Sequence, residues 1–142
     1  MRPFAALLLL ALPMQALAAD LVGTVSVTDG DTLDLHGEHL RLHAIDAPES
    51  SQVCLDGSGQ KYLCGGRAAD ALDKLVAGRT VTCTVLGKAN WGRLTARCAV
   101  GGVDLGAAMV TAGWALAYRE YGLDYVAAWN AATAVAISPK AS

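Results

Sequence analysis

The sequence predicts an α+β domain made mainly of β-strands. Two observations carry this prediction. Short runs in which apolar and polar residues alternate lie within residues 21–45 and 81–100, and apolar residues at helical spacing occur between these regions and after them. A chain of 142 residues also suggests a single domain.

Residues 1–19 have the pattern of a signal peptide. One basic residue, Arg2, precedes an apolar run over residues 4–12, and Ala-Leu-Ala at 16–18 forms a small-x-small cleavage pattern. The run is shorter than the roughly 20 residues that cross a bilayer. We therefore expect residues 20–142 to form one secreted or periplasmic domain. An uncleaved anchor and a buried first helix are the alternatives.

The first three strands are predicted from alternation around two turns. The segments are LVGTVSV (21–27), then the turn DGD (29–31), then TLDLH (32–36) and HLRLHAI (39–45). Gly37-Glu38, between the last two segments, suits a two-residue hairpin turn. This register places residue 31 opposite residue 44 and Arg41 opposite Asp34, where a surface ion pair is the simplest role for Arg41.

The third strand is expected to end at a rigid turn. Its alternation puts Leu40, Leu42 and Ala44 on one face and Arg41, His43 and Ile45 on the other. Pro48 cannot donate a ladder hydrogen bond, so the strand should end near Asp46. Asp31 and Asp46 then reach the same end of the sheet, where two carboxylates and nearby main-chain carbonyls suit a hard cation such as calcium. Two solvated turn aspartates are the alternative.

Three helices are predicted after these strands. Ala68, Ala71, Leu72 and Leu75 follow the i, i+3, i+4, i+7 pattern, which predicts an amphipathic helix from Gly65 to Val76, with Gly78 just past its end. Asp104 is expected to cap a second helix, Leu105 to Ala112, which Gly113 stops, and Leu123 to Ala136 is a third candidate. This order of elements is compatible with a five-stranded OB-type β-barrel with about three helices. Other α+β arrangements of the same order remain open.

The cysteines are expected to form disulfides, because a secreted chain meets an oxidising compartment. They are Cys54, Cys64, Cys83 and Cys98. Residues 81–85 and 94–100 alternate as strands do, and a hairpin with Cys83 opposite Cys98 sets every inward residue against an inward partner. Cys54–Cys64 follows by elimination and closes a short loop. A zinc site is the competing interpretation, but the spacings lack the usual CxxC pairs.

The charge of the chain argues against an ordinary nucleic-acid-binding domain. The formal net charge is −2 at pH 7, whereas most such domains are basic because phosphate neutralisation drives their affinity. Binding to nucleic acid would have to rely on a few placed cations or on a bound metal ion. Arg41 and Arg93 are candidates, although a surface ion pair with Asp34 is the alternative for Arg41 and a solvated loop arginine is the alternative for Arg93.

Several segments together resemble one family. VTDGDTLDL, RLHAIDAPES, SQVC, YLCGGRAADAL, WGRLTARC and GVDLGAAMVTAGWALAY, followed by Tyr125, are similar in order to thermonucleases of the staphylococcal nuclease-like family. The resemblance runs from about Val22 to Tyr125. DGDT followed by RL…IDAPE is its most specific element, and the cysteine pattern resembles that of secreted bacterial members.

The resemblance implies an OB barrel with helices and a calcium-dependent phosphodiesterase that acts on DNA and RNA and leaves 3′-phosphates. By this resemblance, calcium would be bound by Asp31, Asp46 and the carbonyl of Ala47. Glu49 would act as the general base or orient the attacking water. Arg41 and Arg93 would bind the phosphate. Tyr118 and Tyr121 resemble the tyrosines that line the nucleotide pocket. A core ring and a surface ring are the alternatives for them.

Two other functions stay open at this point. One is a catalytically silent OB module that binds single-stranded nucleic acid or oligosaccharide. The other is a small disulfide-bonded domain that binds calcium and a partner but no substrate. The intact set of Arg41, Glu49 and Arg93 favours the nuclease. We expect a monomer without stable membrane association once residues 1–19 are removed.

Overall fold

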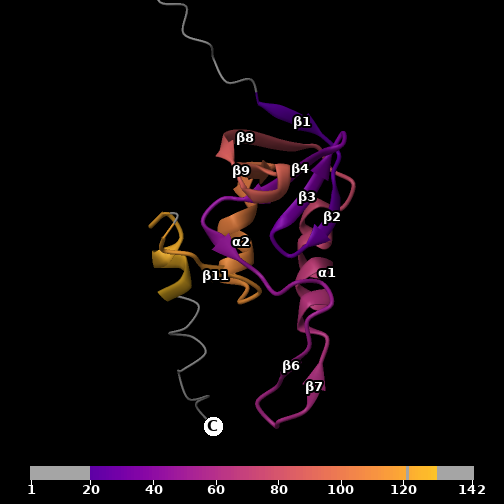
Figure 1. Ribbon diagram of the computed structural model, residues 1–142, viewed down its shortest axis with the longest axis vertical. Helices are drawn as coiled ribbons and strands as arrows, with labels where there is room; N and C mark the ends of the chain where they lie inside the picture. Colours follow the sequence, from indigo (N-terminus) through magenta and orange to yellow (C-terminus); the bar gives the residue numbers. More distant parts are fainter. Residues whose placement is uncertain (1–19, 121, 131–142) are drawn as a thin grey trace, which may run out of the picture.

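The computed structural model describes residues 20–120 and 122–130 (Figure 1). The expected signal peptide, Tyr121 and residues 131–142 lie outside the described residues. The strands are β1 (Leu21–Gly23), β2 (Ser26–Asp29), β3 (Thr32–Leu35), β4 (Glu38–Leu42), β5 (Ile45–Asp46), β6 (Cys54–Leu55), β7 (Lys61–Tyr62), β8 (Val81–Lys88), β9 (Leu94–Val100), β10 (Val103–Asp104) and β11 (Leu116–Ala117), and the helices are α1 (Cys64–Val76), the short 3-10 helix η1 (Asn90–Gly92) and α2 (Leu105–Thr111). Over the described ranges, none of the helices has the length and apolar character needed to cross a membrane.

The main sheet curls because its two edges are neighbours in sequence. The strand order is β1-β8-β9-β4-β3-β2, with β10 paired to β9. β1 and β2 lie at opposite edges, yet residues 24 and 25 are all that separates them along the chain. The edges must therefore lie close together, as a barrel requires. The strand predicted over residues 21–27 is in fact divided between these two edges, and several two-residue strands raise the strand count above the expected five.

The predicted turn at Gly37-Glu38 is wrong by one residue. His36 and Gly37 form the turn between β3 and β4, with φ of 54° and 86°, and positive φ at both central residues is what a tight two-residue hairpin requires. As a result Arg41 pairs with Thr32, and it is His39 that pairs with Asp34. The Leu42 N–H donates to the Asp31 carbonyl at 2.8 Å, so residue 31 lies across from residue 42 and not from residue 44.

The face predicted for Ile45 is also wrong. β4 ends at Leu42, and Ala44 takes a φ of 55° before β5 begins. This left-handed residue interrupts the alternation, so Ile45 turns into the core and is 1% exposed. β5 then pairs with β11, where Asp46 faces Leu116. Asp46, which follows Ile45 in β5, is exposed.

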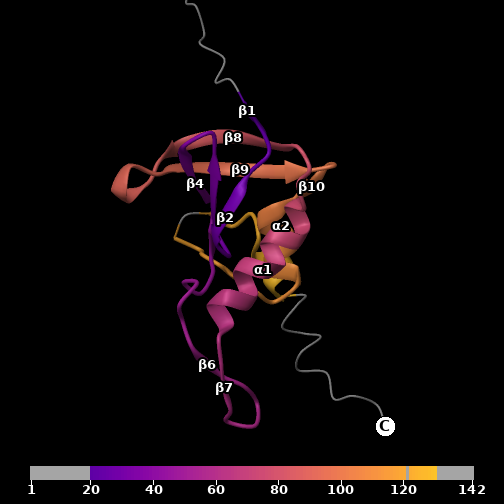
Figure 2. The same ribbon diagram turned by 90° about the vertical axis from the view of Figure 1, so that its right-hand side faces the viewer.

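Both predicted disulfides are present. Cys83 in β8 lies directly opposite Cys98 in β9 and is bonded to it, and the same register sets Val85 against Ala96 as predicted. Cys54–Cys64 joins β6 to the first residue of α1. The β6–β7 hairpin lies inside this second loop and projects from the start of α1 away from the main sheet in both views (Figures 1 and 2).

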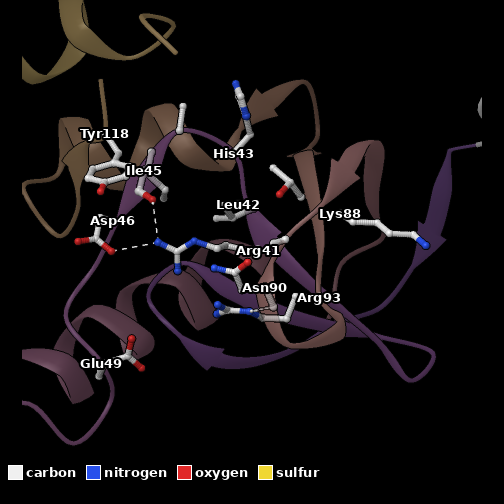
Figure 3. Close-up of a pocket in the computed structure, with 13 residues that line it drawn as sticks. Arg41, Leu42, His43, Ile45, Asp46, Glu49, Lys88, Asn90, Arg93 and Tyr118 are labelled. Carbon is white, nitrogen blue, oxygen red and sulfur yellow. Dashed lines mark hydrogen bonds and ion pairs between the residues drawn. The ribbon is translucent and has the colours of Figure 1, made fainter. Parts of the chain in front are cut away.

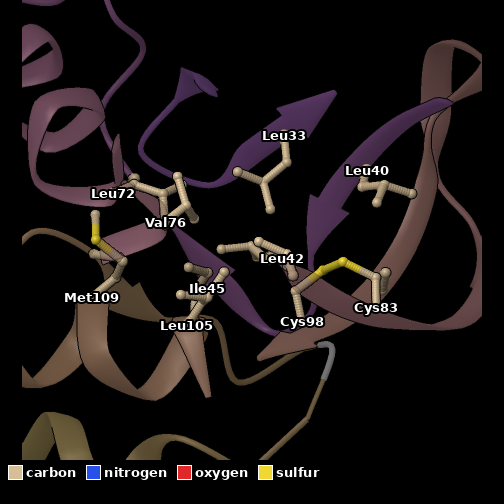
Figure 4. Packing of buried hydrophobic residues seen from close by; sticks show 14 of the residues in the cluster. Leu33, Leu40, Leu42, Ile45, Leu72, Val76, Cys83, Cys98, Leu105 and Met109 are labelled. Carbon is tan, nitrogen blue, oxygen red and sulfur yellow. A yellow bond between two sulfur atoms is a disulfide. The ribbon is translucent and has the colours of Figure 1, made fainter. Parts of the chain in front are cut away.

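The two main helices cover one side of the curled sheet. α1 buries Leu72 and Val76, and α2 buries Met109, in one cluster with Leu42 of β4 and Ile45 of the neighbouring strand β5 (Figure 4). α2 begins as predicted, because the Asp104 carboxylate accepts the Ala107 N–H at 2.9 Å. Of the third predicted helix, residues 126–130 are helical and the remainder lies outside the described residues.

Candidate active site

One pocket of about 450 Å3 lies where β4 and β5 approach the loop between β8 and β9. Five side chains singled out from the sequence line it: Arg41, Asp46, Glu49, Arg93 and Tyr118. Figure 3 shows Arg41 extended between Asp46 and the Asn90–Arg93 loop, with Glu49 on the far side from Lys88. Residues that are distant in sequence therefore share one cavity.

The Arg41 guanidinium is held between two carboxylates. Its Nη1 lies 3.2 Å from Asp31 Oδ2, and its Nη2 lies 3.0 Å from Asp46 Oδ1. Nη2 also donates to the Ile45 carbonyl at 3.4 Å. The planar fork of arginine can satisfy several acceptors at once, so this network fixes the orientation of Arg41 at the wall of the pocket.

Asp31, which contacts Arg41 in the pocket wall, is 2% exposed. Its Oδ1 accepts the Thr32 hydroxyl at 2.9 Å, and its Oδ2 accepts the Ala47 N–H at 2.9 Å. Since Asp31 and Asp46 both contact the same guanidinium, their oxygens face one cationic centre.

These oxygens are of the kind that calcium prefers. Among the described residues, however, no cluster of three or more His, Cys, Asp or Glu side chains could hold a metal ion. A calcium ion at Asp31 and Asp46 would therefore need main-chain oxygens, such as the Ala47 carbonyl, or water to complete its coordination. The donor chemistry fits calcium with that addition.

Arg93 is presented by a tight loop between β8 and β9. The Ala89 N–H donates to the Arg93 carbonyl at 2.8 Å, and the Arg93 Nε donates to the Asn90 carbonyl at 3.2 Å. Trp91, at the tip, takes a φ of 65° and is 91% exposed. β9 runs parallel to β4, and the pairing of Arg41 with Thr95 brings this loop to the Arg41 side of the sheet.

Glu49 follows β5, just after Pro48, and its side chain is exposed to the pocket. Its main chain is held more firmly than its side chain. The Glu49 carbonyl accepts the Gln52 N–H at 2.8 Å, and the next residue, Ser50, donates its N–H to Asp29 Oδ1 at 2.8 Å. An exposed carboxylate therefore projects from a fixed backbone.

Comparison with known proteins identifies the family. Residues 39–140 match the family described as "Staphylococcal nuclease homologue". The chain belongs to this family. The predicted OB-type fold is thereby confirmed, together with the curled, mainly-β sheet described above.

Three relatives are similar to this member of the staphylococcal nuclease homologue family. The succinoglycan biosynthesis protein ExoI of Rhizobium meliloti (strain 1021) is 44% identical over 82 residues, which are 57% of this chain and 43% of ExoI. Uncharacterized endonucleases of Escherichia coli O157:H7 and of Escherichia coli are each 35% identical over 132 residues, which are 89% of this chain and 80% of the relative. The match to ExoI thus spans less than half of that protein.

The pocket of this staphylococcal nuclease homologue also contains side chains that sequence reasoning missed. His43, Lys88, Asn90 and Thr95 line it as well. Lys88 and Asn90 precede Arg93 in the stretch KANWGR, and their place in the same hairpin loop is a signal that could have found them. Tyr118 lines the pocket and donates its hydroxyl to Glu120 at 3.1 Å, whereas Tyr121 lies outside the described residues.

An ion-pair network joins residues near the C-terminal end of the described chain to the pocket wall. His43 Nε2 and Arg97 Nη2 each lie 3.1 Å from the Asp124 carboxylate. The hydrogen bond with His43 and the charge of Arg97 hold the pKa of Asp124 below its ordinary value.

Burial, together with the charge of Asp104, raises the pKa of Tyr125 to about 12. The Tyr125 hydroxyl donates to the Asp104 carboxylate at 3.0 Å.

Proposed function

We propose that this chain is a secreted, calcium-dependent endonuclease that hydrolyses phosphodiester bonds of DNA and RNA and leaves 3′-phosphate ends. The observation that carries the proposal is that Arg41, Arg93 and Glu49 line a single pocket. Two fixed positive groups and one exposed carboxylate are what hydrolysis of a phosphodiester needs in one place. The chain acts on its substrate as a monomer.

The reaction breaks one bond to phosphorus and forms another. Water adds to phosphorus while the bond from phosphorus to O5′ breaks, so the phosphate stays on O3′. Glu49 accepts a proton from the attacking water, and O5′ takes a proton from solvent. Negative charge grows on the non-bridging oxygens during the addition, and the guanidinium groups of Arg41 and Arg93 stabilise that charge.

Asp31 and Asp46, with the carbonyl of Ala47, would hold the calcium ion. When bound, calcium supplies positive charge beside the phosphate oxygens. Two features support this assignment. Asp31 and Asp46 already share one cationic partner, the Arg41 guanidinium. The formal net charge of −2 gives the chain no general excess of positive charge with which to attract phosphate, so a bound cation would supply it locally.

The purified protein is expected to degrade plasmid DNA and RNA when calcium is present and to stop when a chelator removes it. Cut DNA should carry 3′ ends that a polymerase cannot extend until a phosphatase has removed the phosphate. Retarded but uncut strands would instead support a silent nucleic-acid-binding module. No effect on either substrate would support a calcium-binding interaction domain, and degradation in chelator would contradict the role of calcium.

We also propose that the N-terminal segment is removed during export by cleavage just before or just after Ala19. The two disulfides support an oxidising compartment. N-terminal sequencing of the protein from a periplasmic or culture-medium fraction is expected to start at Ala19 or Asp20. Recovery of the chain from the cytoplasm with its N-terminal segment intact would contradict export.

A further inference from the structure

The backbone that carries Glu49 lies against the first turn of α1 with no room between them. A Cβ atom on Gly65 would overlap the carbonyl oxygen of Glu49, and it would lie 2.5 Å from the Glu49 carbonyl carbon and 3.0 Å from that of Ser50. The atoms in the way are main chain, which cannot rotate aside as the end of a long side chain can. Any side chain at position 65 must therefore displace the Glu49 backbone or the helix.

Gly65 is not needed for the conformation of its own backbone. It lies within α1 and is not among the glycines with positive φ. Alanine could adopt the same helical conformation and is a better helix former than glycine. The glycine is therefore explained by the close approach of another backbone, and that backbone belongs to Glu49.

The same segment is also held by the last residue of β2. Asp29 Oδ1 accepts the Ser50 N–H at 2.8 Å. Gln52 connects the segment to α1. Its N–H donates to the Glu49 carbonyl at 2.8 Å, and its carbonyl accepts the Gly65 N–H at 3.2 Å. A displacement of the segment would stretch the bond to Asp29 as well as these two. Residues 49–52 are thus fixed both to the first turn of α1 and to the end of β2.

We propose that Gly65 and Asp29 are positioning residues that set the place of the Glu49 carboxylate relative to Arg41 and Arg93. The inference rests on the proposed function, in which Glu49 is the general base. Because the Glu49 side chain is exposed to the pocket, its main chain is what determines the region that its carboxylate can reach. A general base works only within hydrogen-bonding distance of the proton that it accepts.

The test is the Gly65→Ala variant with Gly66→Ala as its matched control. Both changes add one methyl group to the first turn of α1, but a Cβ on Gly66 would meet the Leu63 side chain, 2.8 Å from its Cδ2, and that side chain is 51% exposed and can move. With calcium and an oligonucleotide substrate, Gly65→Ala is expected to lower kcat at least about tenfold. KM should change little, because Arg41 and Arg93 lie on other parts of the fold. Gly66→Ala should keep the wild-type kcat, and equal kcat in the two variants overturns the role of Gly65.

A second pair of variants decides the matter if Gly65→Ala does not fold, as judged by circular dichroism. Asp29→Ala removes the acceptor for the Ser50 N–H and adds no atoms, so it is expected to fold and to lower kcat. Asp29→Asn keeps an acceptor oxygen and should recover most of that loss. A wild-type kcat in folded Asp29→Ala overturns the proposal.

The Glu49→Gln background separates this inference from the proposed function. If Gly65 acts through Glu49, Gly65→Ala should cause no further loss of kcat in that background, because the two changes disable the same step. An equal loss in both backgrounds would show that Gly65 acts elsewhere. Full activity of Glu49→Gln alone would refute the general-base role itself, whatever Gly65 does.

Discussion

Glutamine in place of Glu49 is expected to lower kcat by roughly 100- to 10,000-fold, the range typical of a lost general base. Glutamine has nearly the size of glutamate, so the backbone that Asp29 and α1 hold in place should be undisturbed. It cannot accept a proton from water, which is the one function that the proposal gives to Glu49. Single-turnover hydrolysis of a labelled oligonucleotide in calcium measures the effect.

Two further measurements make this result specific. Glu38→Gln removes the same charge from an exposed site beside the β3–β4 turn and should leave kcat unchanged. Calcium and uncut oligonucleotide should still bind to the Glu49→Gln protein, because Asp31, Asp46 and the two pocket arginines are intact. Hydrolysis at the wild-type rate would mean that another group takes the proton.

Local patterns in the sequence were sufficient for much of the fold. The pairing of Cys83 with Cys98 could be predicted because β8 and β9 are antiparallel neighbours, and a single register sets apolar residues against each other. α1 could be predicted from helical spacing, and the start of α2 from the Asp104 cap. In each case the determining contacts lie within one helix or between two strands joined by a short connection.

The errors arose where distant contacts overrode local preference. His36 and Ala44 take positive φ, which is uncommon for residues other than glycine, so neither turn could be placed from composition. The division of residues 21–27 between β1 and β2 depends on closure of the sheet, since β1 pairs with β8 and β2 with β3. A strand pattern does not specify which edge of a sheet each half will join.

The candidate site was predictable to the extent that its residues lie in motifs. DGD and IDAPE contain the residues that meet at the Arg41 guanidinium, although the register used to bring Asp31 and Asp46 together was wrong. The packing of Gly65 on Glu49 could not be predicted, because the loop between them contains a disulfide-closed hairpin whose path the sequence does not reveal. The link between His43 and Asp124 was missed for a similar reason, since it joins the residue just after β4 to the C-terminal part of the described chain.

Lysine in place of Arg41 is expected to lower kcat by roughly 100- to 1,000-fold, which is the usual effect of removing one hydrogen-bond donor that stabilises transition-state charge. The positive charge would remain, but a single ammonium group cannot reproduce the planar fork that reaches both Asp31 Oδ2 and Asp46 Oδ1. The phosphate would also lose a bidentate partner. The same single-turnover assay would measure this loss, with the melting temperature recorded for each variant.

Lysine is a more informative replacement than alanine here. Arg41→Ala would leave the carboxylate of Asp31, which is 2% exposed, without its charged partner, and breaking a buried pair in this way costs about 3–5 kcal/mol. A loss of activity could then not be told from a loss of folded protein. Arg79→Lys is the matched control, because Arg79 is exposed past the end of α1 and donates to the Leu75 carbonyl. If Arg41→Lys hydrolyses the oligonucleotide as fast as Arg79→Lys does, charge alone is sufficient at this position and the bidentate role of Arg41 is wrong.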